Sequence, residues 1–176
     1  LGLKQIYPGR YEPEKLLSLI ESEGVTFSHC VPTILHMLLS NALAEKVDLS
    51  RWKVIIGGSA MPPALAKRAR DLGIDVFGGY GMSETCPVLT LSQINLGDIA
   101  RDQKEDLSLR CKAGRAIPLV DLKVVDAELN EMPRDGDATG EVVVRAPWLT
   151  QGYLDDPERS EELWQGGYLH TGDIGH

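Results

Sequence analysis

Residues 53–84 read KVIIGGSAMPPALAKRARDLGIDVFGGYGMSE, and this stretch decides the fold class. An apolar run at 53–56 breaks at two glycines, a helical pattern follows at about 62–72, and a second apolar run at 74–77 also ends in glycines. A strand, a helix and a strand with short connections are typical of a parallel sheet with crossover helices. Ligands of such sheets bind beyond the carboxyl ends of the strands. The sequence therefore predicts that both glycine-rich breaks lie at one site.

The residues upstream extend the same alternation. Pro13 suits a first helical turn, an apolar stripe follows it, and Gly24 ends the helix. Residues 25–30 read as a strand, and residues 33–43 read as a second helix entered through Pro32. We expect an α/β subdomain over residues 1–95 that carries a nucleotide and acyl site.

The second half of the chain has a different pattern. Residues 96–113 are polar and charged without a clear period, so we interpret them as a linker or surface excursion. Apolar residues alternate over 120–125, residues 142–145 form a second β-like run, and turn signals lie between them at 129–136. We expect a small antiparallel β subdomain over residues 114–176.

The composition excludes several classes of protein. A net charge of −8 argues against nucleic acid as a partner, because phosphate contacts need clustered Lys and Arg. No apolar run approaches the roughly 20 residues that span a bilayer. The three cysteines are widely spaced with no C-x-x-C, which favours reduced thiols in a cytoplasmic protein. The chain begins without Met and ends three residues after Asp173, so we expect a piece of a longer protein.

The segment 78–84 has the residue types of a nucleotide site. Glycines 78, 79 and 81 let a flat ligand or a phosphate approach the backbone. Tyr80 offers a face for a base to stack on, Ser83 can donate to a phosphate oxygen, and Glu84 is a hard oxygen ligand suited to magnesium. Taken alone, the spacing favours a glycine-rich turn that Ser83 and Glu84 cap at the start of a helix, because such turns are common.

Two further segments leave alternatives open. In Thr171-Gly172-Asp173 the carboxylate can accept hydrogen bonds from ribose hydroxyls, or the triplet can be an Asx-type turn between strands. Gly57-Gly58-Ser59 can border an adenine edge or an acyl chain, or can form a tight strand-to-helix turn capped by Ser59. It lacks the G-K-[ST] ending of a Walker phosphate loop. His29, at a strand end, can line a substrate pocket.

Read from end to end, nearly the whole chain resembles the adenylate-forming enzymes, which include acyl-CoA synthetases, luciferases and peptide-synthetase adenylation domains. Five stretches carry the resemblance, in the family's order: SHCVPT at 28–33, GGSA at 57–60, GYGMSE at 79–84, GEVVVRAP at 140–147 running on to Gly152-Tyr153, and HTGD at 170–173. Each alone is weak, but the ordered set is highly specific for the superfamily and much less so for the substrate.

The resemblance implies roles for individual residues. Tyr80 stacks on adenine, Ser83 meets the α-phosphate, Glu84 ligates magnesium and Asp173 holds the ribose hydroxyls. Ser83 and Glu84 are the implied catalytic residues. The implied nucleotide-binding residues are Gly57, Gly58, Ser59, Gly79, Tyr80, Gly81, Met82, Ser83 and Asp173, and the implied acid-binding residues are His29, Gly79, Gly81 and Met82.

The implied reaction has two steps and uses ATP, Mg²⁺ and CoA. A carboxylate attacks the α-phosphate of ATP with release of pyrophosphate, and a thiol then takes the acyl group from acyl-AMP. The family's lysine-bearing phosphate loop and its C-terminal domain with a catalytic lysine are not found in these 176 residues. We therefore expect the chain by itself to be inactive.

The resemblance favours a fatty-acyl-CoA ligase. An aryl-acid ligase or a peptide-synthetase adenylation domain is the nearest alternative, and a non-catalytic nucleotide-binding module is a rival of a different class. The sequence leaves open the acyl chain length, the acceptor thiol and the oligomeric state of the whole protein, a homodimer included.

Overall fold

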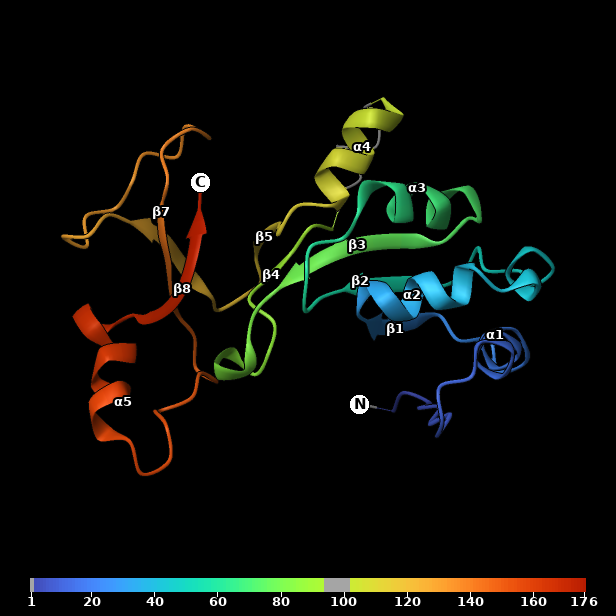
Figure 1. The fold of residues 1–176 in the computed structure, drawn as a ribbon, viewed down its shortest axis with the longest axis horizontal. Helices are drawn as coiled ribbons and strands as arrows, with labels where there is room; N and C mark the ends of the chain where they lie inside the picture. The colour runs from blue at the N-terminus through green and yellow to red at the C-terminus, as the bar shows by residue number, and fades with distance from the viewer. Residues whose placement is uncertain (1, 94–101) are drawn as a thin grey trace. The chain divides into compact units, whose positions relative to one another are not determined.

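The computed structural model describes residues 2–93 and 102–176 (Figure 1). The chain divides into two compact units. The first unit comprises Leu1–Tyr80 and Thr90–Arg115, and the second comprises Gly81–Leu89 and Ala116–His176. The domain limits expected from the sequence, at residues 95 and 113, stay a prediction. Among the described residues, no helix is long and apolar enough to cross a membrane.

The first unit is built on a sheet with the order β1-β2-β3-β4-β5. The parallel strands β1 (Phe27–Cys30), β2 (Lys53–Ile56) and β3 (Asp75–Tyr80) pair in register, so that Cys30 faces Ile56 and Ile56 faces Gly78. The short β4 (Thr90–Leu91) runs antiparallel to β3, and β5 (Arg115–Ala116) follows it in the order. The parallel sheet predicted from residues 53–84 is confirmed.

Helices complete the first unit. They are α1 (Pro13–Ser22), α2 (Pro32–Leu39), α3 (Pro63–Asp71) and α4 (Gln103–Arg110), with a 3₁₀ turn η1 at Ala42–Glu45. A proline opens each of the first three, at a position where the missing N–H has no helical partner. Their apolar stripes bury Leu17, Leu35 and Ala66 against the strand residues Val54 and Val76.

Two helix predictions need correction. The helix expected over residues 33–43 ends at Leu39, because Asn41 caps the separate turn η1 by accepting a hydrogen bond from the Leu43 N–H at 2.9 Å. The segment interpreted as a linker contains α4, although its residues 94–101 lie outside the described part of the chain. The helix was missed because it lacks an apolar stripe. Leu107 packs against the core, and Arg110, which is 7% exposed, bonds to Asp75, Asp106 and the Val76 carbonyl.

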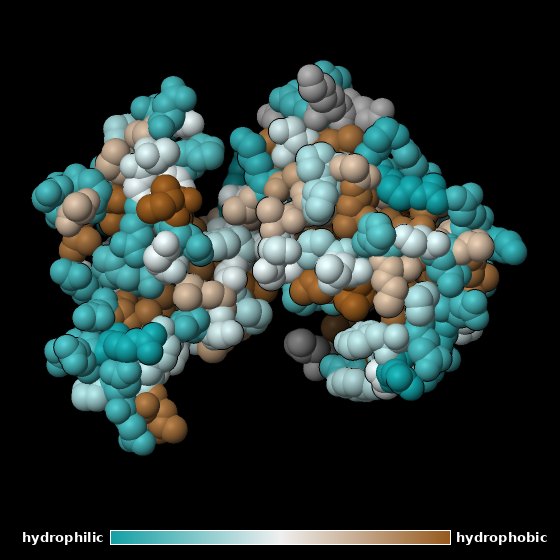
Figure 2. Space-filling model, in the orientation of Figure 1, coloured by the Kyte–Doolittle hydropathy of each residue, from teal (hydrophilic) through white to brown (hydrophobic). Residues whose placement is uncertain are grey.

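The second unit contains an antiparallel sheet with the order β6-β7-β8. Its strands are β6 (Asp121–Val125), β7 (Gly140–Arg145) and β8 (Leu169–Gly175). The unit also contains α5 (Pro157–Leu163) and the 3₁₀ turns η2 (Ser83–Thr85) and η4 (Gln165–Gly167). Val144 and Leu169 are fully buried in its core, whereas the residues around α5 are mostly hydrophilic (Figure 2). The predicted antiparallel sheet is confirmed.

Candidate functional site

The carboxyl ends of the parallel strands bring together three of the predicted site residues. Gly57 directly follows β2 and is buried, and a Cβ there would lie 2.9 Å from Nε2 of His29 and 3.6 Å from the carbonyl oxygen of Gly79. Any side chain at position 57 would therefore displace the His29 ring. Gly58, next to it, has a φ of +79° and is exposed, a conformation that glycine adopts without strain. The topological argument for one shared edge is correct for His29, Gly57 and Gly79.

The path of β3 into its glycines is fixed by one buried serine. The Gly78 N–H donates to Oγ of Ser92 at 2.7 Å, and this hydroxyl donates in turn to the Arg110 carbonyl oxygen at 2.7 Å. β3 thus continues through both glycines, beyond the predicted end at residue 77, and it ends at Tyr80, which is half-buried and pairs with Thr90. The first unit presents Tyr80 from the end of a strand rather than from a loop.

Ser83 and Glu84 lie within the 3₁₀ turn η2 of the second unit, and they do not cap a helix there as the alternative interpretation of this segment expected. Thr85 is fully buried and fixes this turn: its hydroxyl accepts from the Met82 N–H at 2.9 Å and donates to the Pro87 carbonyl at 2.7 Å. A Cβ on Gly81 would collide with that same Pro87 oxygen, so position 81 admits only glycine. Ser83 is exposed and Glu84 is half-buried.

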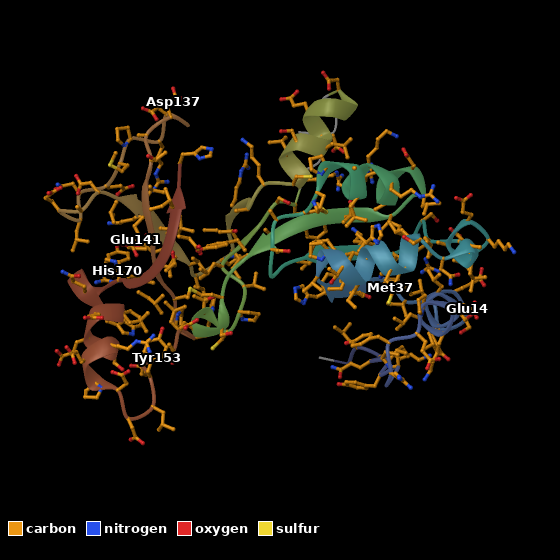
Figure 3. All side chains as sticks on the ribbon, in the orientation of Figure 1. Glu14, Met37, Asp137, Glu141, Tyr153 and His170 are labelled. Carbon is orange, nitrogen blue, oxygen red and sulfur yellow. The ribbon has the colours of Figure 1, made fainter. Side chains whose placement is uncertain are left out.

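Tyr153 holds the Glu84 side chain. The Tyr153 hydroxyl donates to Oε1 of Glu84 at 2.9 Å, and the Thr150 N–H donates to the Glu84 carbonyl oxygen at 2.9 Å. The bond to the carboxylate raises the pKa of Tyr153, since it favours the protonated phenol. The sequence reasoning assigned no role to Tyr153, although the residue stands in one of the stretches that carry the resemblance. Figure 3 labels its position.

The loop that carries Tyr153 is closed on α5. The Tyr153 N–H donates to Oγ of Ser160 at 2.8 Å, and Ser160 donates to the Asp156 carbonyl at 2.6 Å. Asp156 also caps α5 by accepting from the Arg159 N–H, and the Arg159 guanidinium lies 5.0 Å from the centre of the Tyr153 ring. Ser160 thus holds the backbone of Tyr153, Arg159 lies against its ring, and Glu84 accepts from its hydroxyl.

Asp173 lies within β8, on an irregularity in the pairing with β7. Glu141 pairs with Ile174 and Val143 with His170, so residues 171–173 stand opposite the single residue Val142. The alternative of a turn between two strands is therefore wrong for Thr171-Gly172-Asp173. Gly172 has a φ of +72°, and the Asp173 side chain is exposed. His170, before the bulge, contacts Glu141 and the Gln165 carbonyl through its two ring nitrogens.

Among the predicted site residues, the carboxylate of Glu84 is the group suited to bind a magnesium ion. The described residues contain no group of three or more His, Cys, Asp or Glu side chains that could hold a metal. Mg²⁺ usually binds proteins through one or two carboxylates and takes its other oxygens from water and nucleotide phosphates. Glu84, a carboxylate oriented by Tyr153, suits that mode of binding.

Comparison with known proteins gives a family. Residues 1–154 match the profile of the AMP-binding enzyme family. The chain is 38% identical over 178 residues to the long-chain-fatty-acid–CoA ligase of Thermus thermophilus, covering 99% of this chain and 33% of that protein. It is 34% identical to the peroxisomal benzoate–CoA ligase of Arabidopsis thaliana, covering 89% of this chain and 27% of that one.

Solved structures agree with this similarity. The N-terminal domain of FACL13 from Mycobacterium tuberculosis superposes with a TM-score of 0.78 at 29% identity, covering 94% of this chain and 39% of that one. The anthranilate CoA ligase AuaEII, in complex with anthranoyl-AMP, gives a TM-score of 0.77 at 25% identity, covering 96% and 31%. The chain spans about a third of the length of the curated relatives. The chain therefore belongs to the AMP-binding enzyme family.

Proposed function

We propose that this chain is part of an AMP-forming acid–CoA ligase, and that the acid is a fatty acid. The observation that carries the proposal is in the second unit, where both acidic residues of the nucleotide motifs have specific supports. Glu84 is held by Tyr153, and Asp173 stands on a bulge bonded to β7. Family membership and 38% identity to a fatty-acid ligase support the substrate class.

The proposed chemistry follows from the groups present. In the first step an oxygen of the acid attacks the α-phosphorus of ATP, and the bond from that phosphorus to the bridging oxygen of pyrophosphate breaks. Ser83, which is exposed, donates to the α-phosphate, Tyr80 stacks on adenine, and Asp173 accepts from the ribose hydroxyls. A magnesium ion bound to Glu84 would neutralise phosphate charge. In the second step the CoA thiol attacks the acyl carbon, and AMP leaves.

The small residues have a spacing role in this proposal. Gly57 leaves room for the His29 ring, and Gly79 leaves room for the side chains of Ile55 and Leu91. Gly58 and Ser59, which follow Gly57, are exposed. We propose that Gly57, Gly58 and Ser59 border the nucleotide and the acyl group, and that His29, Gly79, Gly81 and Met82 bind the acid. We also propose a cytoplasmic location, which the three free cysteines support.

The test is carboxylate-dependent release of pyrophosphate by the intact protein that carries this chain. Acetate, medium- and long-chain fatty acids, benzoate and amino acids are compared at saturating ATP and magnesium, with Glu84→Ala as the inactive reference. Release with fatty acids that disappears in the variant is the expected result. Release confined to benzoate would favour an aryl-acid ligase, the second candidate, which the similarity to a benzoate–CoA ligase favours. ATP binding without release for any acid would favour a non-catalytic module.

A further inference from the structure

Glu141 pairs with Ile174 next to the bulge in β8, and its carboxylate contacts β8 at two points. One carboxylate oxygen, Oε1, accepts from the Gly172 N–H at 3.0 Å, and the other, Oε2, lies 2.9 Å from Nδ1 of His170. The two contacts lie on either side of Thr171. A single side chain on β7 thus contacts both His170 and Gly172, in the segment that leads to Asp173. Figure 3 labels Glu141 and His170.

Glu141 and His170, the two residues joined by this contact, are each held by further neighbours. Glu141 pairs with Val125 of β6, and the preceding Gly140 packs so closely on the Val125 carbonyl that no Cβ fits there. Nε2 of His170 lies 3.1 Å from the Gln165 carbonyl oxygen, which fixes the ring from its far side. The side chains of Glu141 and His170 are 30% and 15% exposed, so water competes only in part for their bond.

The bulge needs such a support because it interrupts the ladder. Three residues of β8 face one residue of β7, and the Gly172 N–H would otherwise lack a ladder partner. The Thr171 hydroxyl supplies a second tie, since it donates to the Val142 carbonyl at 2.7 Å and accepts from the Asp173 N–H at 3.2 Å. The backbone at Asp173 is thus set by the carboxylate of Glu141 and the hydroxyl of Thr171.

We propose that Glu141 is a positioning residue for the ribose, acting through the bulge on the Asp173 carboxylate. The inference rests on the proposed function, in which Asp173 accepts hydrogen bonds from the ribose hydroxyls. Glu141 contacts the backbone of the bulge rather than the nucleotide, so its removal should weaken only the contribution that the two hydroxyls make to binding.

Two substitutions separate hydrogen bonding from bulk. Glu141→Gln keeps the length of the side chain, and its amide can accept from the Gly172 N–H while donating to Nδ1 of a neutral His170. Glu141→Met has a similar volume but cannot make either bond. Glu131→Gln is the matched control, because Glu131 belongs to the same unit and contacts only Arg134 and Lys123 among the described ion pairs.

The experiment compares ATP with 2′,3′-dideoxy-ATP as substrate in the pyrophosphate assay of the intact protein. The ratio of the two kcat/KM values measures how well the hydroxyls are held. Glu141→Met should lower this ratio by about tenfold, mainly because the KM for ATP rises. A loss of this size is expected when the hydrogen bonds between the Asp173 carboxylate and the ribose hydroxyls are weakened but not abolished. Glu141→Gln and Glu131→Gln should keep the ratio of the unmodified protein.

Each remaining outcome has a defined meaning. If Asp173→Ala leaves the ratio unchanged, the proposed ribose site fails, and this inference fails with it. If Asp173→Ala lowers the ratio but Glu141→Met does not, the inference alone is overturned. Equal losses in Glu141→Gln and Glu141→Met would also contradict it. Should Glu141→Met not fold, Glu141→Asp replaces it, because its shorter side chain cannot span both contacts.

Discussion

The hydrogen bond between Tyr153 and Glu84 joins residues that are 69 positions apart. A carboxylate side chain has two oxygens and several rotamers, and a hydrogen-bond donor held on one oxygen restricts the rotamers that the side chain can adopt. The hydroxyl of Tyr153 provides this donor, and its backbone is held in turn by Ser160. The orientation of Glu84 thus depends on a residue outside its own motif.

We predict that Tyr153→Phe in the intact protein weakens Mg·ATP binding by about threefold to tenfold, less than a fully buried charged hydrogen bond would contribute, because the site is half-exposed. The measurement is the Kd of Mg·ATP by titration calorimetry. Tyr168→Phe is the control, since it removes an equivalent hydroxyl that donates to Asp121 at 2.7 Å in the same unit. Equal effects of the two variants would contradict a specific role for Tyr153.

The three cysteines should differ in reactivity, because the thiolate is the reacting species. Burial raises the pKa of the Cys30 thiol to about 11, and burial also raises the pKa of Cys111, whereas Cys86 is exposed. At about pH 7.5 iodoacetamide should therefore label Cys86 first and Cys30 last. Because its pKa is raised, the Cys30 thiol keeps its proton below about pH 11. The rate of its labelling should therefore increase only as the pH rises toward that value.

Peptide mass spectrometry over time measures the labelling of the chain. Cys86→Ser should remove the fast phase and leave the other two rates unchanged. Rapid labelling of Cys30 near neutral pH, in protein that still unfolds cooperatively, would contradict the burial described for that residue.

At the scale of elements, one buried arginine, Arg110, makes the short polar contacts between α4 and β3. Arg110 donates through Nη1 to Asp75 at 2.7 Å and to the Val76 carbonyl at 3.0 Å, and through Nε to Asp106 at 2.8 Å. These bonds tie the end of α4 to β3, the strand that leads to Gly79 and Tyr80. Ser92 accepts from β3 and donates to the Arg110 carbonyl, so the same connection extends to the glycines.

We predict that Arg110→Met lowers the free energy of unfolding by about 2 kcal/mol, because it leaves Asp75 and Asp106 without their short partner in a partly buried place. Arg70→Met is the control: Arg70 is 36% exposed and reaches the same two aspartates only at 4.0 and 3.9 Å, so it should cost less than about 1 kcal/mol. Urea unfolding measures both. Equal losses would show that Arg110 has no special part in holding α4.

The same elements show what the sequence could reveal. The strands at 53–56 and 74–77 and the helices after Pro13 and Pro62 were predictable, because apolar periodicity and glycine stops report burial directly. α4 was not predictable, since its anchor is a buried arginine that reads as a surface residue. The bulge in β8 was also missed. Local pattern favours a turn at Thr171-Gly172-Asp173, and only the pairing with β7 makes these residues part of a strand.

For the candidate site, the sequence was enough to predict the candidate residues themselves. It was not enough to predict the residues that hold them in place through hydrogen bonds. Tyr80, Ser83, Glu84 and Asp173 stand out by chemistry and by resemblance. Tyr153 and Glu141 act at a distance of dozens of residues, so no spacing rule identifies them. Both nevertheless lie in the stretch that runs from GEVVVRAP to Gly152-Tyr153, where the resemblance is strong but the sequence offers no chemical role.

At the scale of the whole molecule, each unit has its own core and its own part of the nucleotide motifs. The first unit carries Gly57, Gly79 and Tyr80 at the carboxyl ends of its parallel strands. The second unit carries η2 and the bulge of β8. Relatives of this chain are about three times its length. The lysine-bearing segments that the resemblance implies for phosphate binding and catalysis have no counterpart in these 176 residues.

We therefore predict that the 176-residue chain, prepared alone, releases no pyrophosphate with ATP, magnesium and any acid that the intact protein accepts. The physical reason is that each missing preorganised donor typically costs on the order of 10²–10³ in rate, so the loss of two lysines places turnover below detection. A cooperative thermal transition of the isolated chain is the control for folding, and the intact protein at equal concentration is the control for the assay. Measurable acid-dependent release by the folded chain would mean that Ser83, Glu84 and their supports suffice for adenylation, and the lysines would then serve rate enhancement or the thiol-transfer step.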